Sequence, residues 1–321
     1  MNLKTGITSI SVRQNLRLFA PLFGILFSIA VNAQDFEYVY RNPQDSSTNA
    51  YLVVLPQGPI RGMVVRDYTT LPSMQRESPY QYPKLCSEAG LLCLYTDTST
   101  EFPELFIEDS SMFVLEHIMR EVITKYKVPE QNIFIGGISA SGARALRFAE
   151  YCLRSNSALE IRGVFAVDAP LDLARFYYSA SNHRESFKEG MRWEADFMIP
   201  KFEEWFGGGP DSLYQAYKMG SVFSHLDSLG GNAHYLKQTD LILFHEPDID
   251  WWLNERGASY YDINSFDLVA FTQKLRDLGN EEVQLITTSG KGFNPAGERN
   301  CHSWTIVDEK LLVDWMLDRC D

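Results

Sequence analysis

Neither of the two common glycine-rich phosphate-binding patterns, G-x-G-x-x-G and G-K-[ST], occurs in the 321 residues. The sequence therefore gives no indication of a nucleotide-binding loop. The five cysteines fit no zinc-binding spacing, and no repeat or low-complexity tract is present. The net charge is −13 and no basic stripe with interleaved aromatic residues occurs, which argues against a nucleic-acid partner.

The N-terminus has the features of a secretory signal peptide. Lys4, Arg13 and Arg17 precede the apolar run 18–31, and Val31-Asn32-Ala33 fits an A-x-A-like cleavage site. The run has about 14 residues, fewer than the roughly 20 that span a bilayer. No cysteine follows it at the site of a lipoprotein anchor, and no later segment is long and apolar enough to span. We expect cleavage near Ala33, secretion or export to the periplasm, and a mature domain over 34–321.

Strand-like runs alternate with helix-like segments through most of this domain. The expected strands cover 50–56, 62–68, 89–97, 132–137, 163–170, 240–247 and 283–290, and the expected helices cover 110–126, 140–153, 266–278 and 307–317. Such alternation predicts an α/β fold with a mostly parallel central sheet flanked by helices. The first two runs lie close together in the chain, so we expect them to pair.

One region, at about 174–235, interrupts the alternation. It contains no clear core strand, is rich in aromatic residues, and is divided by the run Gly207 to Pro210. We expect a helical cap, because an insertion after a strand of an open α/β sheet lies beside the usual ligand crevice. The alternative is a set of helices that only packs on the sheet.

Ser139 stands between an expected strand and an expected helix, among small residues. A serine hydroxyl needs an adjacent base, exposure at a sharp turn and backbone N–H donors to act as a nucleophile. The tight turn explains Gly137 two residues before Ser139 and Ser141 two residues after it. The N–H of Ala140, at the start of the helix, is an expected oxyanion donor.

The segment Gly137-Ile138-Ser139-Ala140-Ser141 resembles the G-x-S-x-G nucleophile elbow of the α/β-hydrolase family, with Ser141 in place of the second glycine. The resemblance implies a catalytic acid after a late strand and a histidine after the last one. His302 lies between the last expected strand and the last expected helix, so it is the expected base. Asp248 is the expected acid and Asp250 the first alternative.

Glu246 and Asp168 are further candidates for the acid. The second oxyanion donor of the family follows an early strand, which here implies Tyr68 or Thr69, although the usual glycine pair is not present. Trp251 and Trp252 follow the expected acid and are candidate pocket residues.

The expected function is that of an exported serine carboxylesterase with a Ser-Asp-His triad, acting on a small-molecule ester without cofactor or metal. A serine peptidase on the same fold and a non-catalytic binding protein are the alternatives. In an oxidising compartment Cys301 is expected to pair with Cys320; unpaired thiols, or a Cys86–Cys93 bridge alone, are the alternatives.

Overall fold

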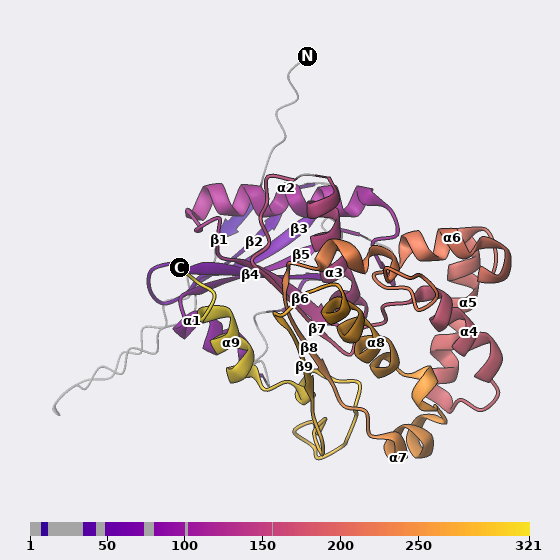
Figure 1. The fold of residues 1–321 in the computed structure, drawn as a ribbon. Helices are drawn as coiled ribbons and strands as arrows, with labels where there is room; N and C mark the ends of the chain where they lie inside the picture. Colours follow the sequence, from indigo (N-terminus) through magenta and orange to yellow (C-terminus); the bar gives the residue numbers. More distant parts are fainter. Residues whose placement is uncertain (1–7, 12–34, 43–48, 74–79, 100–101, 156) are drawn as a thin grey trace.

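A computed structural model describes residues 8–11, 35–42, 49–73, 80–99, 102–155 and 157–321 (Figure 1). The described strands are β1 (Thr8–Ser11), β2 (Phe36–Tyr40), β3 (Ala50–Val54), β4 (Gly62–Tyr68), β5 (Leu91–Asp97), β6 (Ile133–Ile138), β7 (Gly163–Val167), β8 (Asp240–His245) and β9 (Val283–Thr287). The described α-helices are α1 (Tyr82–Glu88), α2 (Asp109–Tyr126), α3 (Ala140–Arg154), α4 (Leu173–His183), α5 (Glu189–Phe206), α6 (Pro210–Gly220), α7 (Ile249–Trp251), α8 (Asn264–Asp277) and α9 (Glu309–Leu317).

The strands form one mostly parallel sheet in the order β1-β2-β3-β5-β4-β6-β7-β8-β9. From β5 to β9 along this order all neighbours are parallel, whereas β1, β2 and β3 join by antiparallel pairing. The predicted fold class is confirmed. The predicted pairing of the first two runs is wrong, because β5 lies between β3 and β4 and pairs with both.

Apolar side chains fill both faces of the sheet, which explains the nearly continuous apolar runs of its strands. Successive side chains alternate between faces: Tyr51 and Val53 pack on the side of α2, α3 and α8, and Leu52 and Val54 on the side of α1 and α9. Figure 1 shows these two groups of helices on opposite sides of the sheet.

The region predicted as a cap consists of α4, α5, α6 and a 3-10 helix, Gly231–Leu236, between β7 and β8. Figure 1 shows α4, α5 and α6 grouped together at one end of the molecule. A buried ion pair ties this insertion to the sheet domain, because Arg175 on α4 contacts Asp267 on α8 at 2.6 Å. His225 also contacts Asp267, at 2.9 Å. The buried ion pair between Arg175 and Asp267 therefore anchors the insertion to α8.

The predicted signal peptide lies mostly outside the described residues. Its one described part is β1, which pairs with β2 at the edge of the sheet. Of the helices in the described ranges, none is both long and apolar enough to cross a membrane.

Candidate active site

Ser139 occupies the sharp turn between β6 and α3. Its φ of 55° and ψ of −129° lie in a region that L-residues rarely adopt, and its N–H donates to the carbonyl of Val167 on β7 at 2.8 Å. A Cβ on Gly137 would lie 2.6 Å from the Cβ of Ser141, so only glycine fits at Gly137. The chain therefore makes a sharp, closely packed turn at Ser139, between β6 and α3.

Ser141 and Arg144 tie the first turns of α3 to the end of β4. The hydroxyl of Ser141 donates to the carbonyl of Asp67, and the Arg144 guanidinium pairs with the Asp67 carboxylate. Both charged side chains are almost fully buried, and Thr98 also donates to Asp67, at 3.1 Å. The Ser141 hydroxyl thus holds the end of β4, next to Tyr68.

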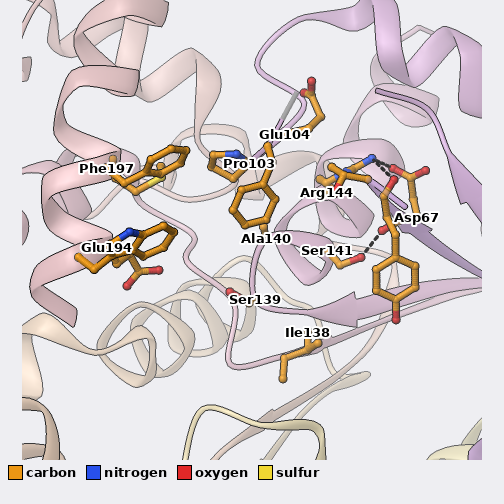
Figure 2. Close-up of a pocket in the computed structure, with 15 residues that line it drawn as sticks. Asp67, Pro103, Glu104, Ile138, Ser139, Ala140, Ser141, Arg144, Glu194 and Phe197 are labelled. Carbon is orange, nitrogen blue, oxygen red and sulfur yellow. Dashed lines mark hydrogen bonds and ion pairs between the residues drawn. The ribbon is translucent and has the colours of Figure 1, made fainter. Parts of the chain in front are cut away.

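The serine cavity has a volume of about 300 Å³ and contains Ser139. The three expected oxyanion residues, Tyr68, Thr69 and Ala140, lie along it. Its apolar wall comes from the insertion and the loop before α2, namely from Phe102, Pro103, Trp193, Phe197 and Met198. Figure 2 shows Ser139 between Arg144 and Asp67 on one side of this cavity and Glu194 and Phe197 on the other.

His302 and Asp168 form a hydrogen-bonded pair at the same edge of the sheet. The Nδ1 atom of His302 lies 2.5 Å from Oδ2 of Asp168. Asp168 follows β7 directly, and β7 pairs with β6, so its carboxylate emerges beside the turn that carries Ser139. The side-chain amide of Asn264 donates to the Asp168 carbonyl at 2.9 Å and supports this backbone, whose φ is 42°.

The pKa of His302 reflects two opposing effects. Burial lowers it, but the hydrogen bond and the negative charge of Asp168 outweigh burial and raise the pKa above its ordinary value. Glu194 adds to this increase and Arg256 opposes it. With Nδ1 held by the carboxylate, Nε2 is the nitrogen that is left to exchange a proton.

The expectation that Asp248 partners His302 is wrong. Asp248 instead accepts from the backbone N–H of Trp251 at 3.0 Å, as the N-cap of α7, and pairs with Arg299 at 2.5 Å. Glu246 also pairs with Arg299, at 2.8 Å. The first alternative, Asp250, is exposed in the first turn of α7. The carboxylates after β8 thus hold the loop that leads to His302, rather than the imidazole itself.

His302 lines a second cavity of about 280 Å³, the histidine cavity. Trp252 also lines it, as expected of a pocket residue. Trp251 does not, and packs edge-on against Trp252 with ring centroids 5.1 Å apart. Arg256 and Asn300 give this cavity a more polar wall than that of the serine cavity.

Trp193 and Glu194 on α5 border both cavities. Within the described part of the chain the Ser139 hydroxyl makes no hydrogen bond, to His302 or to any other residue. Such catalytic hydrogen bonds are often long in the absence of substrate and tighten when it binds. The sequence prediction did not include Glu194, because a single carboxylate in a helix with several acidic residues forms no distinguishing pattern.

All five cysteines are free thiols, so the predicted Cys301–Cys320 bridge is wrong. Cys301 is buried with Phe187 and Trp252 beneath the insertion, whereas Cys320 packs on the side of the sheet that α1 and α9 cover. The two sulfur atoms therefore belong to different clusters. Cys86 and Cys93 form no disulfide bond either.

No protein-family model matches the sequence, and no curated protein matches it. Solved structures match in fold. A thermophilic carboxylesterase cloned from a metagenomic library aligns with a TM-score of 0.55 at 12% identity, over 85% of each chain. Carboxyl esterase 2 from the mycorrhizal fungus Tuber melanosporum gives 0.54 at 12% identity, over 85% of this chain and 81% of that one.

An S-formylglutathione hydrolase from Agrobacterium tumefaciens aligns with a TM-score of 0.52 at 12% identity, over 90% of this chain and 96% of that one. At such identities the similarity concerns the fold alone. Together with the strand order it shows that the chain has the α/β-hydrolase fold.

The His302–Asp168 pair predicts a titration that can be measured by NMR of the imidazole nitrogens. The pKa of His302 is expected above its ordinary value of about 6.5. In Asp168→Asn the pKa is expected to fall below that of the unsubstituted protein, because burial remains while the opposing carboxylate charge is lost. Asp248→Asn removes one charge from the neighbouring loop and serves as the matched control. An unchanged pKa in Asp168→Asn would contradict the pairing.

Proposed function

We propose that this protein is a serine hydrolase that cleaves carboxylic esters through an acyl-enzyme, with Ser139 as nucleophile, His302 as base and Asp168 as the acid. The observation that carries the proposal is the 2.5 Å contact between His302 and Asp168 at the sheet edge where Ser139 occupies its turn. A nucleophile elbow beside an oriented imidazole is the arrangement that acyl transfer requires.

In the proposed reaction the Ser139 hydroxyl oxygen attacks the ester carbonyl carbon while Nε2 of His302 takes its proton. Asp168 holds the tautomer and stabilises the imidazolium that forms. The N–H of Ala140, with that of Tyr68 or Thr69, donates to the oxyanion. The intermediate collapses as His302 gives the proton to the departing alcohol, and water then repeats the sequence to release the acid and restore Ser139.

The cavities support an assignment of the two parts of the substrate. The imidazole protonates the leaving alcohol, so the histidine cavity is proposed to receive the alcohol and the serine cavity the acyl group. A volume of about 300 Å³ and an apolar wall suit a small acyl group. Two of the solved structures of similar fold are named carboxylesterases, which supports ester over amide hydrolysis by analogy of fold.

We also propose that the protein is exported after cleavage near Ala33. The sheet from β2 to β9 begins at Phe36, three residues after that site, so cleavage would leave it complete except for β1. N-terminal sequencing of the exported protein is expected to start at Gln34. A secreted or periplasmic form that begins at Met1 would contradict the proposal.

Ser139→Ala is expected to lower kcat/KM for ester hydrolysis by more than about 10³-fold, as removal of a nucleophile does, and to abolish labelling by a fluorophosphonate probe. Alanine tolerates the turn as well as serine does, so circular dichroism and Tm should stay close to those of the unsubstituted protein. Ser155→Ala removes an exposed hydroxyl from the other end of α3 and keeps the nucleophile; it is the matched control, which must still be labelled.

Labelling of the Ser139→Ala variant, or equal turnover by it, would contradict the assignment of the nucleophile. A protein that is never labelled at Ser139 and hydrolyses no ester would favour the non-catalytic binding alternative. Faster cleavage of aminoacyl amides than of matched esters would favour the peptidase alternative.

Trp193 and Phe202 on α5 are expected to respond to truncation in opposite ways. Trp193 lines both cavities and is 60% exposed, so Trp193→Ala should change the kcat/KM ratio between short and long acyl esters with little change in Tm. Phe202 is fully buried, so Phe202→Ala should lower the free energy of unfolding by about 3–5 kcal/mol and keep the ratio. Urea unfolding measures the free energy of unfolding of each variant, and a panel of acyl esters measures its kcat/KM ratio. Unchanged selectivity in Trp193→Ala would contradict the role of α5 as a cap.

A further inference from the structure

Glu194 is a carboxylate on α5 that borders the serine cavity and the histidine cavity together. Among the described residues, none donates a hydrogen bond to it or forms an ion pair with it. Asp67 and Glu246, by contrast, each contact an arginine. Figure 2 shows Glu194 across the cavity from the Arg144–Asp67 pair. Glu194 thus brings a carboxylate without a hydrogen-bond or ion-pair partner among the described residues to the space in front of Ser139.

Partial burial disfavours the charged form of Glu194. Burial raises the pKa of Glu194 above its ordinary value; His302 and Arg256 oppose the increase, and Asp168 adds to it. Glu194 is partly shielded from water and has no hydrogen-bond partner among the described residues, and a bound cation that donates hydrogen bonds would stabilise its charged form.

Aromatic rings next to Glu194 supply a second attraction for a cation. Trp193 and Phe197 are stacked with centroids 5.3 Å apart and an interplanar angle of 5°, and Phe102 lies 6.2 Å from Phe197. All three rings line the serine cavity. Trp193 and Phe102 are each 60% exposed, and aromatic faces attract ammonium groups at exposed sites as well, so a carboxylate beside them forms a site for an organic cation.

The charges of the two cavities differ and decide where a cation would bind. Among the described residues that line the serine cavity, Glu104 accepts a hydrogen bond from the N–H of Phe106 at 2.7 Å, and the one arginine, Arg144, is already paired with Asp67. In the histidine cavity the carboxylate of Asp262 is already paired with His183 at 2.6 Å. Arg256 brings a guanidinium to the same cavity, which lies over Trp251 at 5.4 Å and repels a second cation. The serine cavity, on the acyl side of the scissile bond, is the more favourable of the two.

We propose that the serine cavity binds an ammonium group on the acyl part of the substrate and that Glu194 selects it. The inference rests on the proposed serine-hydrolase function and makes α-aminoacyl esters the substrate class. A cavity of about 300 Å³ accommodates one short aminoacyl group. The net charge of −13 on the whole chain further favours cationic over anionic substrates.

Alanine ethyl ester and ethyl isobutyrate test this selection, because they differ by an ammonium group in place of a methyl group. At pH 7 the ammonium group is mostly protonated, since α-amino groups have pKa values of about 7.7–8.0. The unsubstituted protein is expected to show the higher kcat/KM for the alanine ester. In Glu194→Gln the ratio between the two esters is expected to fall by about tenfold or more. Glu204→Gln removes an exposed carboxylate from the same helix and should keep the original ratio.

Binding without turnover separates this inference from the proposed function. In Ser139→Ala, alaninamide is expected to bind more tightly than isobutyramide by isothermal titration calorimetry, and the added Glu194→Gln change should remove the difference. If both esters are hydrolysed, their kcat/KM ratio is the same in Glu194→Gln, and alaninamide and isobutyramide bind equally, the ammonium site is overturned while serine hydrolysis stands. Tighter binding of alaninamide with no hydrolysis of either ester supports the ammonium site and overturns the proposed function.

Discussion

The left-handed turn at Ser139 is the constraint on which the rest of the site depends. Backbone at a φ of 55° is unfavourable for a residue with a side chain, so it persists only because its surroundings fix it from several directions. The hydrogen bond to Val167 holds the turn to β7, and Gly137 leaves room for the close approach of Ser141. Ser141 in turn holds the carbonyl of Asp67. One local geometry therefore links three strands and the start of α3.

The buried Arg144–Asp67 pair extends this linkage behind the serine cavity. Two charges are taken out of water there, which is favourable only when the geometry is good and additional hydrogen bonds satisfy the remaining atoms. Thr96 and Thr98, on and just after β5, donate those bonds to Asp67. The consequence is a fixed end of β4, and with it a fixed position for the backbone of Tyr68 and Thr69.

Which acidic residue contacts His302, and which ones contact Arg299, depends on which strand lies next to β6. Asp168 directly follows β7, the neighbour of β6 in the sheet, and its carboxylate contacts His302. Glu246 and Asp248 come after β8, one strand further away, and both pair with Arg299 in the loop that carries the histidine. The loop is thereby held by two ion pairs at one end while Asp168 orients the imidazole at the other.

The sequence by itself determined the α/β class, the strand-to-helix turn at Ser139 and the position of His302 after the last strand, because apolar periodicity and small residues at a sharp turn are local properties. It did not determine that β5 separates β3 from β4, that Asp168 rather than Asp248 contacts His302, or that Cys301 and Cys320 lie in different clusters. These depend on lateral strand order and on which face a side chain occupies. The same holds for Glu194, whose position between two cavities arises only when α5 packs over the end of the sheet.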